Sequence, residues 1–166
     1  MSKRVDVLVV GGGVVGLAAA VGMASRGFQT AVMDAGSLHV MPEANNMRVY
    51  AMNGASQALL TRLGVWPLLK PDIISPYQGM HIWDATNQAK IIFDARDAAK
   101  AELGVIVEEA PLRIALLRRL EALGVHLIPN TRVTACVDEA AGMHVTGDGG
   151  TSWEAKFLMV ADGANS

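Results

Sequence analysis

The 166-residue sequence lacks the features of several common protein classes. Its one cysteine, Cys136, excludes an internal disulfide and fits a reducing compartment. The net charge is −2, and no run of basic residues is longer than Arg118-Arg119, so a nucleic-acid-binding surface is not indicated. No uninterrupted apolar stretch reaches the roughly 18 residues that a membrane-spanning helix needs. Charged residues make up only 18%. The chain is therefore expected to contain much buried parallel sheet, or to pack part of its surface against something else.

The sequence also contains little that would mark a hydrolase or a metalloenzyme. Its four histidines are scattered without helical spacing, so no metal site is predicted. There is no G-x-S-x-G motif and no plausible triad. Cys136 lies in a strand-like pattern and is expected to be a small core residue rather than a nucleophile. No catalytic residue can be assigned from the sequence.

The first third of the chain reads as a strand, a glycine turn, a helix and a second strand. Val5–Val10 is a short β-branched run, typical of a strand buried on both faces of a parallel sheet. Gly11–Gly13 turn the chain, and Val14–Arg26 predicts a helix rich in small residues. Gly27 ends that helix. Thr30–Asp34 then predicts the neighbouring strand.

The glycines of this turn have the spacing G-x-G-x-x-G, and each has a separate physical role. Gly11 permits the tight turn, Gly13 leaves room for a pyrophosphate against the backbone, and Gly16 lets the helix pack on the strand. The helix start offers the N–H groups of Val14 and Val15, together with a partial positive charge that suits phosphate. The motif predicts a phosphate-binding turn, and a purely structural turn is the alternative.

An acidic residue follows at the distance expected for a dinucleotide site. Asp34 ends the second predicted strand, near the roughly 20 residues at which a carboxylate would bind ribose hydroxyls. The same carboxylate would repel a 2′-phosphate, so NADP is not expected in this pocket. NAD and FAD both remain open, because both carry an ADP group. An ordinary surface aspartate is the alternative interpretation.

The middle of the chain predicts a loop, a helix and a hairpin. Ala35–Tyr50 reads as a loop, and Asn53 as the cap of a helix that runs to Leu63. Leu59, Leu60 and Leu63 are expected to face inward on that helix. Gln78–Asp84 and Lys90–Asp94 predict the two strands of a hairpin.

The last third predicts one helix and several strands. Pro111 is expected to open a helix that ends at Gly124. The leucines expected to form its apolar stripe are Leu112, Leu116, Leu120 and Leu123. The strand-like segments that follow are Val125–Ile128, Arg132–Val137, Met143–Thr146 and Trp153–Ala161. We expect one dinucleotide-binding domain, formed by residues 1–70 and 108–166, with residues 71–107 as an excursion from it.

Three further segments carry a resemblance to a known family. They are Arg48–Asn53 with Ala55-Ser56, Val107–Leu112, and Phe157–Ser166 with its Asp162-Gly163 pair. With the glycine fingerprint, they make the whole chain resemble the FAD-dependent aromatic hydroxylases, a family of flavin monooxygenases, and most of all the ubiquinone-biosynthesis hydroxylases. The resemblance implies an α/β fold: a Rossmann-like FAD-binding domain of three layers, with a mainly parallel sheet, a β-meander and part of a substrate-domain β excursion.

The resemblance also implies roles for individual residues. The FAD pyrophosphate would be bound by Gly11, Gly13, Val14, Val15 and Gly16. Asp34, with Ala35 beside it, would bind the adenosine ribose, where the family more often has Glu. Arg48 would bind the flavin side of the cofactor, and Val133 would offer backbone atoms to the adenine. Asp162 and Gly163 would support FAD and a nicotinamide donor. Glu109 stands where relatives tend to have an amide.

The implied reaction is hydroxylation of a phenolic or quinol ring, with a prenylated ubiquinone precursor as the expected substrate. The cofactor would be FAD, with NAD(P)H or another electron donor and O₂ as co-substrates. We expect a cytoplasmic protein, with a location at the membrane surface as the alternative. The family continues with an arginine after Asp-Gly and a later Gly-Asp motif. The chain therefore reads as an N-terminal fragment that is inactive alone and prone to self-association.

Two other interpretations remain open. One is an NAD-dependent dehydrogenase or an FAD reductase that never activates oxygen, although the Arg48 segment and Asp162-Gly163 weigh against the dehydrogenase. The other is a non-catalytic fragment that serves only as a folding or assembly unit.

Overall fold

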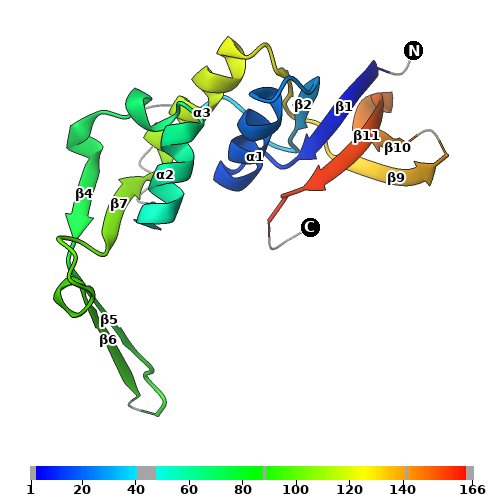
Figure 1. Ribbon diagram of the computed structural model, residues 1–166. Helices are drawn as coiled ribbons and strands as arrows, with labels where there is room; N and C mark the ends of the chain where they lie inside the picture. Colours follow the sequence, from blue (N-terminus) through cyan, green and yellow to red (C-terminus); the bar gives the residue numbers. More distant parts are fainter. Residues whose placement is uncertain (1–2, 41–47, 88, 141, 164–166) are drawn as a thin grey trace.

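The computed structural model describes residues 3–40, 48–87, 89–140 and 142–163 (Figure 1). Its elements alternate between strands and helices in the first half and are mostly strands in the second. In chain order the main ones are β1 (Lys3–Val10), α1 (Val14–Ala24), β2 (Thr30–Met33), β3 (Val49–Asn53), α2 (Gly54–Arg62), β4 (Ile74–Tyr77), β5 (Gly79–Trp83), β6 (Lys90–Asp94), β7 (Gly104–Glu108), α3 (Glu109–Ala122), β8 (His126–Ile128), β9 (Val133–Glu139), β10 (Gly142–Gly147) and β11 (Ser152–Val160).

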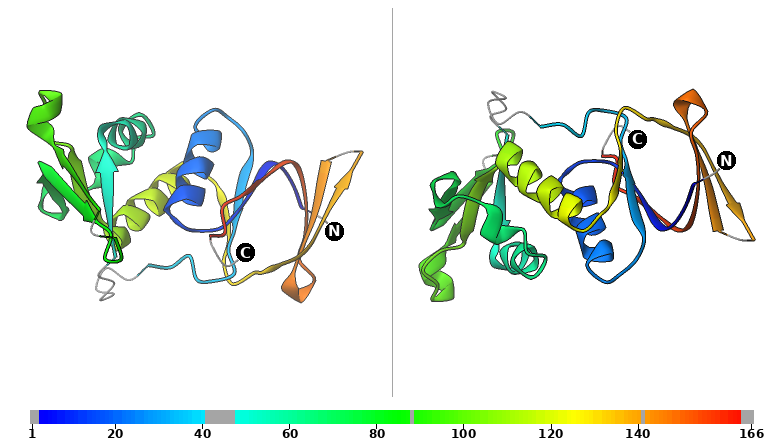
Figure 2. Two further views of the ribbon diagram at one scale, coloured as in Figure 1. Left: turned by 90° about the horizontal axis from the view of Figure 1, so that it is seen from below. Right: turned by 90° about the horizontal axis from the view of Figure 1, so that it is seen from above.

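A six-stranded sheet forms the centre of the fold, in the order β8-β2-β1-β11-β10-β9. The first four strands are parallel, and β9, β10 and β11 form an antiparallel meander. Helices α1 and α3 pack side by side against this sheet (Figure 2). The sequence-based expectation of an α/β fold with a mainly parallel sheet and a meander is confirmed.

The predicted strand–turn–helix–strand unit is present at its predicted place. All four residues of β2 are buried, as are Val7, Leu8 and Val9 of β1. Strand β1 pairs in parallel with β2 on one side and with β11 on the other. Because both its neighbours are strands and its faces are covered, β1 needs the continuous apolar run that the sequence supplies. Helix α1 ends at Ala24, two residues before the expected Arg26.

Two apolar clusters lie on the two faces of the parallel strands. On one face, side chains of α1 and α3 pack onto β1 and β2. On the other, Val145 and Trp153 of the meander pack against Leu8 and Met33 of the parallel strands. Only four residues, 129–132, join β8 to β9, although these strands are at opposite ends of the sheet order. The sheet must therefore curl so that the end of β8 and the start of β9 approach each other.

A second, three-stranded sheet, β3-β7-β4, lies on the other side of the helices from the main sheet, and β5 and β6 form a projecting hairpin (Figure 1). The hairpin confirms the prediction for residues 78–94. The prediction that Ala35–Tyr50 is entirely loop was wrong at its end, because Val49 and Tyr50 pair with Glu108 and Val107 of β7. Residues 41–47 of that predicted loop lie outside the described residues.

Helix α2 begins where its cap residue predicted. The Asn53 side chain accepts a hydrogen bond of 2.9 Å from the Ser56 N–H, as expected of an N-cap. Leu60 and Leu63 are buried, but the inward orientation expected for Leu59 was wrong: it is 44% exposed. The helix is short and packs along one narrow side, so only one of the two adjacent leucines can face the core.

Helix α3 begins earlier than expected. Glu109 is its first residue, so Pro111 lies within the first turn rather than opening the helix. Leu112, Leu116 and Leu120 of the predicted stripe are fully buried, and its fourth member, Leu123, is partly buried against the same core.

The expectation that Cys136 is a core residue was wrong, since the residue is exposed on β9. This edge strand of the sheet is exposed along nearly its whole length, so its strand-like composition does not imply burial. Over the described ranges, no helix combines the length and apolar character that a membrane crossing requires. Within the same ranges, no group of three or more His, Cys, Asp and Glu side chains gathers as a metal site.

Candidate dinucleotide-binding site

The glycine turn between β1 and α1 packs closely against the carboxyl ends of β2 and β11. The Gly11 N–H donates to the Met33 carbonyl at 2.8 Å, and the Gly11 backbone has φ of +112°. A Cβ at Gly11 would overlap the carbonyl oxygen of Ala161, just past β11. A Cβ at Gly16 would overlap the carbonyl oxygen of Gly11. Gly16 thus has the packing role expected from the sequence, while Gly11 also makes room for β11, which the sequence did not predict.

The start of α1 is open and has no side-chain cap. Gly13 is the N-cap residue, and the first turn contains no acidic side chain. The Leu17 N–H donates to the Gly13 carbonyl at 2.9 Å, so the N–H groups of Val14 and Val15 precede the helical hydrogen-bond ladder. No atom lies within 4 Å of a Cβ built on Gly13. Uncapped donors, the helix dipole and open space together make this helix start suitable for an anion.

The Asp34 carboxylate points back to the glycine turn. Its Oδ2 accepts a hydrogen bond of 2.5 Å from the Gly12 N–H, and its Oδ1 accepts one of 2.7 Å from the Gly36 N–H. Asp34 is therefore held at the end of β2, beside the turn, rather than extended into solvent. Each carboxylate oxygen keeps further lone pairs, so the group can still accept hydrogen bonds from ribose hydroxyls.

A cavity of about 380 Å³ opens beside this carboxylate. Its lining comes from the carboxyl ends of β1, β2 and β11 and from the segment that enters β9. The lining residues are Val10, Gly11, Asp34, Ala35, Thr131, Arg132, Val133 and Asp162. The cavity lies where β1 has a parallel neighbour on each side, which is the switch point at which open α/β sheets bind ligands.

The predicted site residues divide into three groups. One cavity brings together Gly11, Asp34, Ala35, Val133 and Asp162, although they come from four separate parts of the sequence. The adjoining turn and helix start hold Gly13, Val14, Val15 and Gly16. Arg48 and Gly163 do not line the cavity. Gly163 follows Asp162 directly and is exposed.

Sequence reasoning missed three residues of the cavity wall: Val10, which was predicted only as part of a strand, and Thr131 and Arg132. The Thr131 N–H donates to the Asp34 carbonyl at 2.8 Å, and the Asn130 N–H donates to the Gly36 carbonyl at 2.9 Å. These bonds tie the β8–β9 link to the residues after β2. They exist because the sheet curls, and no local pattern in the sequence encodes that curvature. The only signal in the sequence was that Thr131 and Arg132 directly precede Val133, which was predicted to contact the adenine.

Arg48 lies beside the first turn of α3. Its Nε is 3.8 Å from Oε2 of Glu109, and the Glu109 N–H donates to the Arg48 carbonyl at 2.9 Å. Glu109 is only 7% exposed, whereas the Arg48 side chain is 69% exposed. A buried carboxylate needs a nearby cation or donor, and Arg48 is such a neighbour. The backbone bond explains the position of Arg48 next to Glu109.

The same carboxylate affects Tyr50. Burial raises the pKa of the Tyr50 hydroxyl above its usual 10.0, and the negative charge of Glu109 raises it further. Because the folded pKa lies above the unfolded one, the resulting stabilisation is complete below pH 10 and is lost as pH rises through the folded pKa. We expect Glu109→Gln to lower the pKa of Tyr50, because the amide carries no charge. Near-ultraviolet titration of the phenolate measures this.

Tyr77→Phe provides the background for that titration, since Tyr50 and Tyr77 are the two tyrosines of the chain. The Tyr50 pKa is then compared between the Tyr77→Phe variant and the double variant that also carries Glu109→Gln. Glu102→Gln is the matched control, because it removes a carboxylate that does not contribute to the Tyr50 pKa. An unchanged or increased Tyr50 pKa in Glu109→Gln would contradict this electrostatic assignment.

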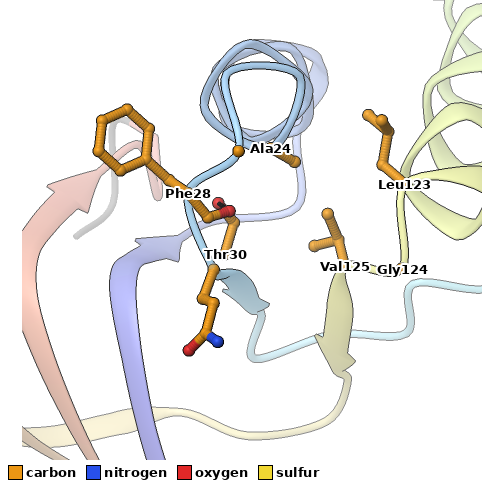
Figure 3. Close-up of a pocket in the computed structure, with 8 residues that line it drawn as sticks. Ala24, Phe28, Thr30, Leu123, Gly124 and Val125 are labelled. Atoms are coloured by element: carbon orange, nitrogen blue, oxygen red, sulfur yellow. Dashed lines mark hydrogen bonds between the residues drawn. The ribbon is translucent and has the colours of Figure 1, made fainter.

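A second cavity, of about 260 Å³, lies at the opposite end of β2 (Figure 3). Figure 3 shows it between the end of α1 and the turn that follows α3, with Phe28, Thr30, Leu123 and Val125 around it. Its lining contains no carboxylate, cation or other titratable side chain. It lies away from the open helix start and the carboxyl ends of the strands, so we do not regard it as the functional site.

Comparison with known proteins gives a family match along nearly the whole chain. Residues 4–166 match the family described as "FAD binding domain". The 3-demethoxyubiquinol 3-hydroxylase of Escherichia coli K12 is 33% identical over 173 residues, which cover 99% of this chain and 43% of that protein. The ubiquinone biosynthesis monooxygenase COQ6 of Danio rerio is 29% identical over 178 residues, covering 97% of this chain and 37% of that protein.

Solved structures give the same fold. The Diels-Alderase PyrE3 superposes with a TM-score of 0.79 at 24% identity, over 99% of this chain and 33% of that one. At this identity the match supports the fold alone. The chain spans less than half the length of the relatives that it matches, so their named activities are properties of much longer polypeptides.

Proposed function

Because this chain belongs to the FAD binding domain family, we propose that its glycine turn and the Asp34 cavity bind the ADP half of FAD. The observation that carries the proposal is the juxtaposition of an uncapped helix start with a carboxylate at the end of the neighbouring strand. Pyrophosphate needs the donors of the first, and ribose hydroxyls need the acceptor of the second.

The proposed contacts follow the geometry of the turn. The N–H groups of Val14 and Val15 bind the pyrophosphate, which passes over Gly13 where no side chain intervenes. Gly11 and Gly16 hold the turn in the required shape. The cavity is within the usual size range of small-ligand sites, roughly 300–1,000 Å³.

The remaining contacts lie in and beside the cavity. Asp34, with Ala35 beside it, binds the ribose, and Val133 lies next to the adenine. Asp162 and Gly163 follow β11, and we assign them to the pyrophosphate end of the cofactor. Arg48 lies outside the cavity on the α3 side, and we assign it to the flavin side of the cofactor.

We propose that the whole protein is an FAD-dependent monooxygenase that hydroxylates a phenolic or quinol ring in ubiquinone biosynthesis. The names of the E. coli and zebrafish relatives support this assignment. FAD, when bound, supplies the redox chemistry, with NAD(P)H or another donor and O₂ as co-substrates. The residues described above bind and orient the cofactor, and none of them transfers a proton to substrate. The 166-residue chain alone is therefore expected to be inactive.

The domain layout proposed from the sequence assigns residues 1–70 and 108–166 to the FAD-binding domain. Residues 71–107, which include the β5–β6 hairpin, form the excursion toward the substrate. This hairpin exposes several large apolar side chains: Ile82, Trp83, Ile91, Ile92 and Phe93. Such a surface favours contact with other apolar surfaces. We propose self-association of the chain through it, and a cytoplasmic location at the membrane surface, where a prenylated substrate would reside.

The binding proposal predicts a choice between two nucleotides. 5′-AMP should bind to the chain, and 2′,5′-ADP, which differs from it only by an added 2′-phosphate, should bind at least about tenfold more weakly, because the Asp34 carboxylate repels that phosphate. Titration calorimetry or amide chemical-shift titration measures both affinities. Asp72→Asn serves as the control. This carboxylate lies outside the cavity, so its removal should leave the weaker binding of 2′,5′-ADP unchanged. Absence of 5′-AMP binding, or preference for 2′,5′-ADP, would contradict the proposal.

A separate measurement tests the reaction. Full-length protein should purify yellow, release flavin on denaturation, and consume oxygen with NADH only when a phenolic substrate is present. A colourless protein would contradict the flavin assignment. Oxidation of the nicotinamide without oxygen uptake or hydroxylated product would support the alternative, a reductase or dehydrogenase.

A further inference from the structure

Arg132 lines the nucleotide cavity, and the proposed ADP contacts do not use it. Within the described ranges, its guanidinium makes no hydrogen bond to another residue and no ion pair with one. The Asp34 carboxylate, which lines the same cavity, accepts from the backbone N–H groups of Gly12 and Gly36 and forms no ion pair with Arg132. In the described part of the chain, the cavity wall therefore carries a planar guanidinium that no side chain binds directly.

The backbone of Arg132 is fixed on both sides. Its N–H donates to Oδ1 of Asp148 at 3.0 Å, and its carbonyl accepts from the Asp148 N–H at 2.8 Å. On its other side, the Thr131 N–H bonds to the Asp34 carbonyl. The long side chain thus starts from a fixed point of the backbone close to the proposed ribose contact, although the residue as a whole is exposed.

The order of elements along the sheet edge indicates which part of a nucleotide reaches Arg132. The helix start that suits phosphate follows β1, and Asp34 follows β2, the neighbouring strand. The next strand outward is β8, whose link to β9 carries Thr131 and Arg132. A nucleotide with phosphate at the first position and ribose at the second must place its base at the third.

We propose that Arg132 is a specificity-determining residue that holds the adenine ring by stacking its guanidinium on the face of the base. This inference rests on the proposed binding of ADP. A guanidinium is planar and weakly hydrated, so it stacks on aromatic faces and is attracted to their π electrons. A lysine at this position would keep the charge but lose the planar surface.

The test uses the 166-residue chain with ADP and inorganic pyrophosphate as probes. The Nε–H resonance of Arg132, assigned by its loss in Arg132→Gln, should move upfield when ADP is added, because the base ring shields a proton above its face. Pyrophosphate should leave this resonance in place while it shifts the amide signals of Val14 and Val15. Arg132→Gln should weaken ADP binding about tenfold. Arg118→Gln, which changes an exposed arginine of α3 outside the cavity, should not alter it.

Three results would overturn the inference. An Arg132 resonance that ADP does not move would exclude contact with the base. A shift caused equally by pyrophosphate would identify Arg132 as a phosphate contact instead. Unaltered ADP affinity in Arg132→Gln would show that the contact contributes nothing. Absence of ADP binding to the unaltered chain would overturn the proposed function as well, which distinguishes that failure from the other three.

Discussion

Replacing Gly11 by alanine is expected to destabilise the chain by about 3 kcal/mol or more. The backbone at Gly11 has φ of +112°, a conformation that costs an alanine of order 1–3 kcal/mol. The added Cβ would also overlap the Ala161 carbonyl oxygen, so the turn would have to move away from β11. Thermal unfolding followed by circular dichroism should show the midpoint falling by roughly 10 °C.

A control separates this clash from the general effect of removing a glycine. Gly54 begins α2, and a Cβ built there has no atom within 4 Å. Gly54→Ala should therefore unfold close to the temperature of the unaltered chain. If Gly11→Ala unfolded at that same temperature, the close approach between the turn and β11 would be contradicted.

Gly13→Ala is expected to weaken ADP binding by about 30-fold or more while the fold stays intact. Gly13 has φ of −74° and ψ of 173°, which alanine adopts without strain, and its surroundings are open. The methyl group would enter the space through which the pyrophosphate approaches Val14 and Val15. Losing one charge-assisted hydrogen bond costs about 1.5–3 kcal/mol, which corresponds to about 10-fold to 150-fold in affinity. Titration with ADP measures the loss.

Measuring the thermal stability of Gly13→Ala together with its ADP affinity separates a loss of binding from a loss of folding. Gly13→Ala should unfold within a few degrees of the unaltered chain, since replacing an N-cap glycine costs no more than about 1 kcal/mol. Gly54→Ala, the same change at the start of a different helix, should bind ADP normally. Unchanged ADP affinity in Gly13→Ala would contradict the proposal that the phosphates bind at the start of α1.

Local patterns predicted the first unit of the fold because its signals lie within a few residues of one another. The run Val5–Val10, the glycine spacing and the cap at Asn53 all act on their own neighbourhood. The β3-β7-β4 sheet was not predicted, because its strands are short and pair across long stretches of chain. The exposure of Leu59 and Cys136 was missed for a related reason, since burial depends on which elements arrive from elsewhere.

The site shows the same division. The glycine spacing and Asp34 predicted where phosphate and ribose would be recognised, and the structure brings these residues together. The hydrogen bond from the Gly12 N–H to Asp34 was not predicted, because the triple glycine offered no reason to single out its middle member. Thr131 and Arg132 reach the cavity only through the curl of the sheet, which depends on packing between the meander and the parallel strands.

The position of β11 also affects how the chain is synthesised. Strand β1 pairs from Lys3 to Val10 with residues Trp153 to Val160, which are synthesised about 150 residues later. Until then, one apolar edge of β1 has no partner and can join another nascent chain. Closing so large a loop is also slow, because its entropy is lost before any contact compensates for it. Misassembly during translation is therefore a greater hazard for this protein than its compact central sheet suggests.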